Sequence, residues 1–484
     1  MPKTAIVWLR NDLRFADNPA LRRAAAEADY VVPLYIYSTA EAGKWSPGGA
    51  TNWWLHHSLK EFSAAAERLG SPLILREGST LNNIIDVIDR CGADAVYWNC
   101  AYEPAARQLE AEVGRALTKR GVMSAPNQGN TLLRPDLLAT GKGEPYKVFT
   151  PFWRALVGRE EDIPPPLPKH PSFEAPEKEI PSMSLESLQL LPAIRWDVGI
   201  EATWEPGEHG AHKMLERLIA EVLMSYESGR NAPSEENVSR LSPYLHFGEL
   251  SPRTVWRELR KHAVTTHGTK HAVDIFLRQI VWREFATYLL YHFPHTAELP
   301  LRSEFNEFPW QDNDNVLRAW QKGQTGYPIV DAGMRELWTT GWMHNRVRMI
   351  VASFLVKDLL VPWQRGAEWF WDTLVDADLG NNTMGWQWVA GCGADAAPYF
   401  RIFNPVLQGE KFDARGQYVR RWVPELAKLD DKWIHRPWDA PPLVLQAAGV
   451  SLGKTYPNPI VDHANARGLA LLAYSTISRK SRAS

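Results

Sequence analysis

The residues best suited to chemistry lie in two short stretches of the C-terminal half. In the stretch 376–388, Asp376 and Asp378 stand two residues apart on what the sequence indicates is a turn between helices. Carboxylates in such a turn can accept hydrogen bonds from a ligand or pair with a cation. In the second stretch, Asn345 and Met349 are four residues apart, which puts both side chains on the same helix face. A thioether packs against an apolar ligand and cannot donate a proton.

Tryptophan is unusually frequent, with 22 residues among 484. Core packing seldom requires so much indole, because each buried Trp N–H needs a hydrogen-bond acceptor. We expect most of these side chains to pack in large aromatic cores. The positions of a few indicate a further role.

The composition is that of an ordinary globular protein, with 45% hydrophobic and 23% charged residues, and 484 residues are enough for two domains. No apolar run reaches the roughly 18–20 residues that span a bilayer, and the N-terminal sequence lacks the order of a signal peptide. The three cysteines are widely spaced and give neither a disulfide framework nor a metal site. These features predict a cytoplasmic protein without a membrane or metal partner. Because the net charge is −2, nucleic-acid binding would require a local basic patch.

The N-terminal quarter alternates short apolar runs with amphipathic stretches. The runs 5–10, 31–37, 72–77 and 95–100 are typical of buried strands, and the helical stretches lie around 18–28, 50–69, 80–91 and 104–120. This alternation predicts a parallel sheet with helices on both faces. No G-x-G-x-x-G follows the first strand, so the usual dinucleotide-binding motif is absent.

The rest of the chain changes character twice. Residues 160–206 are rich in proline and predict a long connector over the surface. From about residue 208 onward the hydrophobic period is helical almost throughout. We therefore expect an α/β domain over 1–130, an interdomain linker over 131–207 and a larger all-α domain over 208–484.

Long motifs then connect the chain with a known family. They are WLRNDLRFADNPAL (8–21), SRLSPYLHFGELSPR (239–253), IVWREF (280–285) and the stretches 326–363 and 376–413. The sequence resembles the photolyase/cryptochrome family from end to end, in particular bacterial photolyases of cyclobutane pyrimidine dimers and the class III group allied to plant cryptochromes. The resemblance implies an FAD-binding helical domain. Light-excited reduced FAD would inject an electron into a dimer flipped out of the DNA and split it into two pyrimidines.

The resemblance also implies the contacts to FAD. In the family pattern Asp378 accepts a hydrogen bond from the flavin ring and Asn382 faces flavin N5. Arg348 pairs with Asp376, and its charge favours the anionic reduced flavin. The other implied cofactor-binding residues are Tyr226, Val238, Ser239, Arg240, Leu241, Ser242, Phe276 and Ala377.

The substrate side follows from the same pattern. Trp282 and Trp388 match two indoles that sandwich the flipped dimer, and with them Gln279, Asn345, Met349 and Asn382 are the implied catalytic residues. Repair enzymes of (6-4) photoproducts carry two histidines where this chain has Asn345 and Met349, which favours the cyclobutane substrate. Family repair enzymes commonly have Glu where this chain has Gln279. Gln can bond a thymine carbonyl but has no proton to share.

The alternative function is a cryptochrome-type blue-light photoreceptor with little or no repair activity. At the position of Asn382, plant cryptochromes carry Asp and animal cryptochromes Cys, whereas Asn is typical of repair enzymes. Signalling members often have a long C-terminal tail, which we do not expect here because the sequence stops at Ser484.

Electron transfer and DNA contact complete the expectations for the helical domain. Trp386, Trp363 and Trp310 match the family chain of indoles that carries electrons between flavin and surface. The implied DNA contacts, mostly to phosphates, are Arg230, Gln279, Trp282, Arg283, Asn345, Arg346, Lys411 and Arg421. We expect a monomer that acts on double- or single-stranded UV-damaged DNA in the bacterial cytosol.

The N-terminal domain of this family usually holds a light-harvesting antenna pigment. The run TNWWLHHSL (51–59) resembles members that use a folate, and Trp53 and Glu103 are the candidate contacts. We expect 5,10-methenyltetrahydrofolate, with 8-hydroxy-5-deazaflavin as the alternative. The run at 51–59 is equally explained by a helix that packs on the sheet.

Overall fold

Five parallel strands form a sheet at the N-terminal end of the computed structural model, which describes the backbone of residues 2–483 and the side chains of residues 2–478. The strands are β1 (Thr4–Leu9), β2 (Tyr30–Tyr37), β3 (Ile74–Glu77), β4 (Ala95–Asn99) and β5 (Met123–Asn127). Their order is β3-β2-β1-β4-β5. Strand β1 is buried along its whole length, with Ala5 opposite both Val31 and Ala95. Burial on both faces explains its continuous apolar sequence.

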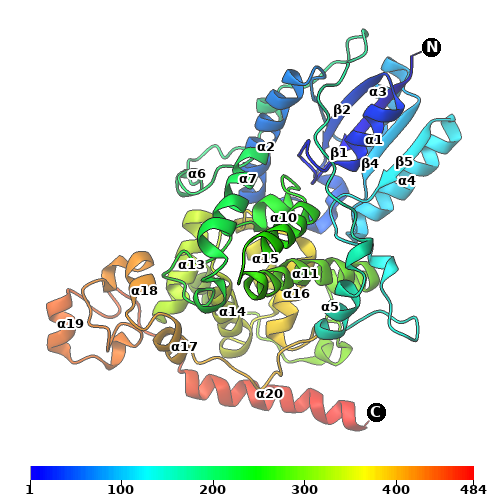
Figure 1. Cartoon of the computed structure of the whole chain (residues 1–484). Coiled ribbons are helices and arrows are strands. Elements are labelled where there is room, and N and C mark those ends of the chain that lie inside the picture. The colour runs from blue at the N-terminus through cyan, green and yellow to red at the C-terminus, as the bar shows by residue number, and fades with distance from the viewer. Residues whose placement is uncertain (1, 484) are drawn as a thin grey trace.

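Two helices cover each face of this sheet (Figure 1). They are α1 (Pro19–Glu27) and α2 (Gly49–Arg68) on one face, and α3 (Thr80–Cys91) and α4 (Pro104–Arg120) on the other. Helix α1 begins where the side chain of Asn18 accepts a hydrogen bond from the backbone of Leu21. The predicted α/β fold class is confirmed. Strand β5 was not predicted from the sequence. It is an edge strand in which only Ala125 is buried, so it lacks the continuous apolar run of the other strands.

The segment 131–207 connects the two domains and contains two helices, α5 (Phe149–Val157) and α6 (Val198–Glu201). Its proline-rich part follows the N-terminal domain, to which it is tied by backbone hydrogen bonds from Val31 to Glu174 and from Phe173 to Leu69. Helix α5 instead packs on the long helix α11 (Lys270–His292) of the second domain. The connector therefore contacts both domains along its length.

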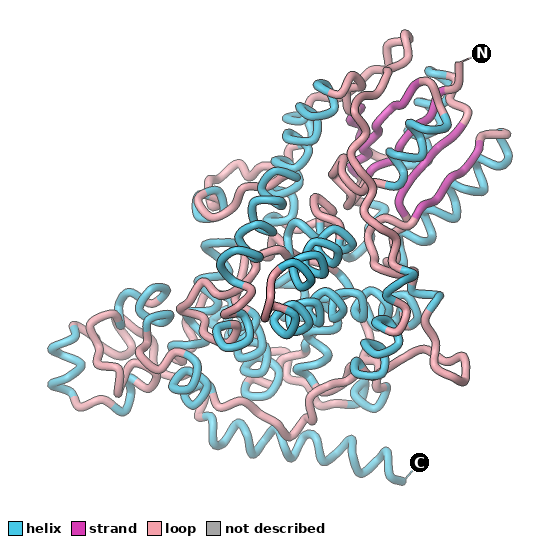
Figure 2. The backbone as a smooth tube through the Cα atoms, viewed as in Figure 1, coloured by secondary structure: helices cyan, strands magenta, loops and turns pink. Residues whose placement is uncertain are grey.

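Helices form the second domain, and Figure 2 shows the strands confined to the N-terminal part of the described chain. Besides α11, the helices are α7 (Glu208–Arg217), α8 (Tyr226–Gly229), α9 (Ser242–His246), α10 (Pro252–Thr265), α12 (Asp314–Gln321), α13 (Pro328–Thr340), α14 (Asn345–Ser353), α15 (Trp363–Thr373), α16 (Leu379–Ala390), α17 (Pro405–Phe412), α18 (Gln417–Trp422), α19 (Pro442–Ala448) and α20 (His463–Ala483). The all-α expectation is confirmed. We propose the boundaries 1–130, 131–207 and 208–484, which agree with the end of β5 at Asn127 and the start of α7 at Glu208.

The two domains share one hydrophobic core. The side chains of Ala5, Val7 and Leu9, on one face of β1, belong to the same buried cluster as Trp256 and Phe276 of the helical domain. The opposite face of the sheet has a separate core, which includes Ile6 and Trp8. Because one core crosses the boundary, the domains are packed against each other as parts of one body. Among the described residues, no helix has the length and apolar character needed to cross a membrane.

Candidate functional site

A cavity of about 510 Å³ lies within the helical domain. Its walls come mainly from α9, α11, α14 and α16 and from the turn before α16. The structure brings most of the sequence-predicted site residues together at this cavity. They are Tyr226, Ser239, Leu241, Ser242, Phe276, Gln279, Trp282, Arg283, Asn345, Arg348, Met349, Asp376, Ala377, Asp378, Asn382, Trp386 and Trp388.

Asp378 provides an anionic acceptor at this wall. Its Oδ1 atom accepts hydrogen bonds at 2.8 Å from both the backbone and the side-chain amide of Asn381, and so caps α16. Oδ2 lies 4.0 Å from Nδ1 of His246. Burial alone would raise the pKa of Asp378, but the imidazole of His246 and the guanidinium of Arg283 hold it well below its usual range. Asp378 is therefore ionised, with one oxygen free to accept from a ligand.

A buried ion pair stands next to Asp378. The guanidinium of Arg348 reaches both carboxylate oxygens of Asp376, at 3.0 and 2.9 Å, and a further N–H donates to the carbonyl of Met343 at 2.8 Å. The carboxyl side chain of Asp376 is 4% exposed and that of Arg348 24%. This pairing was predicted from the sequence. It fixes a positive charge at the cavity wall without leaving a buried carboxylate unpaired.

The amide of Asn382 has a defined orientation. Its Nδ2 donates to the backbone carbonyl of Ala367 at 3.0 Å. This bond to α15 fixes the orientation of the amide and uses one of its two N–H donors, and the amide oxygen has no partner within the described protein and is open to a ligand in the cavity. Asn382 thus presents an acceptor, which suits an N–H on the ligand.

An aromatic ring from α5 packs on one face of the Trp282 indole. The Phe149 ring of α5 stacks on it with centroids 3.6 Å apart and planes 5° apart. Trp282 also borders the cavity, as do Trp388 and Gln279. Phe149 was not recognised from the sequence, because its helix lies in the segment expected to be a linker. The only available signal was the short apolar run around it.

Asn345 and Met349 lie one turn apart on α14, and both border the cavity. The helix begins at Asn345 because the ring of His344 accepts a hydrogen bond from the backbone of Arg346 at 3.2 Å. Burial lowers the pKa of His344 to about 4, so this ring is neutral. The ring is also not among the side chains that line the cavity. The cavity face of α14 therefore presents no imidazole.

The basic residues predicted to contact DNA differ in their surroundings. Arg283 donates to the carbonyls of Asn130 and Leu245, at 3.0 and 3.2 Å, and so stabilises the cavity wall. Arg346 donates to Asn231 at 2.7 Å and lies over the ring of Phe412. Arg230 lies near Tyr226, whereas Lys411 and Arg421 are exposed.

Two predicted cofactor contacts lie just outside the cavity lining. The carbonyl of Val238 accepts from Arg217 at 3.3 Å. Arg240 has a left-handed backbone, with φ of 52°, and its guanidinium lies 5.1 Å from the ring centroid of Trp342. The intervening Ser239 and the following Leu241 and Ser242 do border the cavity.

The three indoles of the predicted electron-transfer chain belong to one aromatic-rich core. Trp386 borders the cavity and is 2% exposed, Trp363 is 1% exposed, and Trp310 is half-buried. Trp386 is also 6.1 Å from the ring of Trp320, centroid to centroid. The indole at the cavity thus has a second, fully buried indole as its neighbour.

The two predicted antenna contacts are unlike each other. Trp53 is 1% exposed, and its indole N–H donates to Asp197 at 3.1 Å. With both the ring and its N–H engaged, Trp53 offers no free face to a pigment. Glu103 lies at the start of α4, where burial and the charge of Asp378 raise the pKa of its carboxyl to about 7. An antenna site would therefore rest on Glu103.

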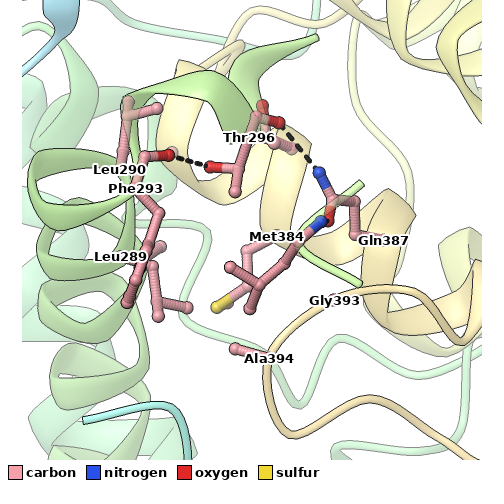
Figure 3. A pocket seen from close by; sticks show the side chains of 12 residues that line it. Leu289, Leu290, Phe293, Thr296, Met384, Gln387, Gly393 and Ala394 are labelled. Carbon is pink, nitrogen blue, oxygen red and sulfur yellow. Dashed lines mark hydrogen bonds between the residues drawn. The ribbon is translucent and has the colours of Figure 1, made fainter. Parts of the chain in front are cut away.

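A second cavity, of about 20 Å³, lies between α11 and α16 (Figure 3). Its lining is mostly apolar, and Met384 borders both cavities. The amide of Gln387 is engaged, because it donates to the carbonyls of Thr296 and Leu299 at 2.8 and 2.9 Å. This volume has room for about one water molecule and for no cofactor.

Comparisons with known proteins place these features in context. Residues 5–172 match the family model described as DNA photolyase, and residues 276–476 match the FAD binding domain of DNA photolyase. The chain is 47% identical to a deoxyribodipyrimidine photo-lyase of Agrobacterium fabrum over 99% of both chains. It is 41% identical to cryptochrome-2 of Arabidopsis thaliana, covering 98% of this chain and 79% of that protein. A crystal structure of a class III photolyase from Agrobacterium tumefaciens superposes with a TM-score of 0.96 at 47% identity, covering 99% and 98% of the two chains.

Proposed function

Because the chain belongs to the photolyase/cryptochrome family, we propose that it is a deoxyribodipyrimidine photo-lyase that uses light to repair cyclobutane pyrimidine dimers in DNA. One observation carries this proposal. A single cavity joins the acceptors Asp378 and Asn382 with the indoles of Trp282 and Trp388. The first pair suits a flavin ring and the second a flipped pair of bases.

The residues of the cavity fit FAD, which when bound supplies the light-excited electron that opens the ring of the dimer. A volume of about 510 Å³ lies within the usual range for cofactor sites. Asp378 and Asn382 offer one free acceptor each, and the Arg348–Asp376 pair keeps a cation at the wall. A fixed cation beside the ring favours its anionic reduced form.

The lesion contacts favour the cyclobutane dimer. Trp282 is backed by Phe149, so its free face can stack on a flipped base, a contact worth about 1–3 kcal/mol per base. Gln279 can donate its amide N–H to a thymine carbonyl. Asn345 and Met349 carry no titratable proton, which disfavours a (6-4) photoproduct that requires an acid.

DNA binding would rest on phosphate contacts around the cavity. Lys411 and Arg421 are exposed and available, and Arg230 and Arg346 stand beside the cavity residues Tyr226 and Asn345. Such contacts are independent of sequence and weaken with salt. We propose that the protein acts as a monomer in the reducing cytosol, which agrees with its free thiols at Cys91, Cys100 and Cys392.

For activation in light, we propose that Trp386, Trp363 and Trp310 carry an electron toward the oxidised flavin. The cavity position of Trp386 and the partial exposure of Trp310 support this direction. For light harvesting, we propose 5,10-methenyltetrahydrofolate held through Glu103, with 8-hydroxy-5-deazaflavin as the alternative. The visible absorption spectrum of the isolated protein distinguishes the two pigments.

Repair can be tested directly. The purified protein, with its flavin reduced, is illuminated with UV-damaged oligo(dT), and the recovery of base absorbance is followed against a dark control. We expect recovery in light only. No recovery would overturn the repair assignment in favour of a photoreceptor, and recovery only on DNA that carries (6-4) photoproducts would overturn the substrate.

A further inference from the structure

The loop that follows β1, residues 10–18, occupies the place where a doubly wound sheet usually binds a ligand. That place is the crevice beyond the carboxyl ends of the strands where the order reverses, here between β1 and β4. The side-chain amide of Asn99 donates to Asp12 at 2.7 Å and to Asn18 at 2.8 Å across this crevice. All three side chains are buried. The crevice is thus filled by the chain itself.

Arg14 extends from this loop into the boundary between the domains. It is 1% exposed, and all five of its N–H donors are used. Two go to the carbonyl of Asp17, at 3.1 and 2.9 Å, and two reach Gly129 and Asn130 just after β5, at 2.7 and 3.1 Å. The fifth donates to the carbonyl of Gly248 in the helical domain at 2.8 Å.

Asp17 makes the second connection across the boundary. Its carboxylate accepts two hydrogen bonds from Arg253 of α10, at 3.1 and 2.9 Å, with both side chains at most 3% exposed. Its backbone has a φ of 49°, which is unusual for a residue other than glycine. Such a conformation persists where surrounding contacts hold it in place. The loop is therefore fixed from both sides.

The loop holds the segment 245–248, whose first two residues, Leu245 and His246, form part of the wall of the large cavity. The backbone N–H of Leu13 donates to the carbonyl of Phe247 at 3.2 Å, next to the Arg14 contact with Gly248. The approach is close: a Cβ on Gly248, whose φ is 64°, would lie 2.1 Å from the carbonyl oxygen of Asn11. Only glycine fits there.

His246 lies in this segment and turns toward the cavity. Its ring is 8% exposed, and Nδ1 has no hydrogen-bond partner. This atom is 4.0 Å from Oδ2 of Asp378, the oxygen that remains free for a ligand. The position of the backbone at 245–248 therefore sets the distance between His246 and Asp378.

We propose that the loop 10–18 is a clamp by which the N-terminal domain fixes the wall 245–248 and places His246 against Asp378. Arg14 is then a positioning residue for FAD, although it does not line the cavity. This inference rests on the proposed function for the identity of the ligand. It also explains the motif at 8–21, which contributes no residue to the cavity lining.

The test compares FAD binding in two variants of the clamp. Arg14→Lys removes the donor to Gly248, and Gly248→Ala forces the segment away from Asn11 while Arg14 remains. For each we expect the Kd of FAD for the apoprotein to rise about tenfold or more, since a shifted wall displaces His246 from Asp378 and weakens the bond of the ligand to that charged acceptor, and a hydrogen bond to a charged group contributes at least about that factor. We also expect the visible absorption band of the bound flavin to broaden, which reports its surroundings.

Ile84→Ala is the matched control. Ile84 is fully buried in the core on the other face of the sheet, so its loss destabilises the same domain without touching the clamp. We expect this variant to bind FAD as the wild type does. Wild-type affinity and spectrum in a folded Gly248→Ala protein would overturn the proposal, as would an equal loss of FAD in Ile84→Ala.

Neither light nor DNA enters this experiment. A failure of dimer repair would therefore contradict the proposed function but not the role proposed for the clamp. A wild-type protein that binds no FAD would contradict the proposed function itself.

Discussion

Replacing Phe149 by Leu should weaken recognition of the lesion while leaving the flavin in place. Phe149 is 6% exposed, and its ring lies 3.6 Å from that of Trp282, nearly parallel to it. Leu keeps most of the buried volume, so the fold should lose less than about 1.5 kcal/mol. The substitution removes the aromatic stack between Phe149 and Trp282, which fixes the orientation of the indole at the cavity.

The size of the effect follows from the stack. An aromatic pair contributes about 0.5–1.5 kcal/mol beyond its buried area, which corresponds to about a 2- to 12-fold change in an equilibrium constant. If Trp282 must be held in this orientation to stack on a flipped dimer, the Kd for UV-damaged oligo(dT) should rise by that factor. Binding to undamaged DNA should stay the same, because it depends on phosphate contacts.

The assay is fluorescence anisotropy in the dark, with FAD-loaded protein and labelled oligo(dT) before and after irradiation. Phe152→Leu is the control: it lies on the same helix and is 1% exposed, but it packs on Phe285 and Tyr288. We expect it to bind damaged DNA as the wild type does. An equal loss in both variants, or an unchanged Kd in Phe149→Leu, would refute the role assigned to the stack.

Three further predictions concern light, pH and the antenna. Trp363→Phe should nearly abolish photoreduction of the oxidised flavin, measured by its visible absorbance in light, while repair by chemically reduced protein continues; equal photoreduction would remove Trp363 from the electron path. Burial raises the pKa of the Glu336 carboxyl to about 7. Between about pH 4.5 and pH 7 this carboxyl is therefore protonated in the folded protein and ionised in the unfolded chain, so the free energy of unfolding falls as the pH rises through this range. Glu336→Gln should reduce that fall by about 3 kcal/mol in urea unfolding at pH 5 and 8, and an unchanged pH dependence would contradict the assigned pKa. Glu103→Gln should remove the antenna band from the absorption spectrum and keep the flavin band; retention of both would place the antenna elsewhere.

Local patterns were enough to predict the fold class, whereas most of the cavity residues were implied by the resemblance of long motifs to a known family. The buried strands are continuous apolar runs and the helices have a regular period, so both are visible without tertiary contacts. Asp376, Asp378 and Asn382 were implied by the resemblance of the stretch 376–413 to the family, and Asn345 and Met349 by that of the stretch 326–363. The local spacing added only that Asn345 and Met349 share one helix face.

Residues that act through a distant partner could not be found in this way. Phe149 belongs to a segment that looked like a linker, and it matters only because α5 packs on α11. Trp53 was a candidate antenna contact because of its type and place in a motif, but Asp197, 144 residues away, takes its N–H. Such pairings depend on how elements pack, and no local spacing encodes them.

The sequence by itself determined most of the elements and the two-domain plan, because these depend on residue type and short-range period. The side chains expected to meet FAD and a dimer came from motifs that resemble a known family. Only the tertiary structure decided which of those side chains share one cavity and in which protonation state. It also placed the loop after β1, which the sequence offered only as a motif, between the sheet and the wall 245–248. The physical reason is that burial and long-range hydrogen bonds, which fix the charge of Asp378 and the position of Arg14, exist only once distant segments have packed together.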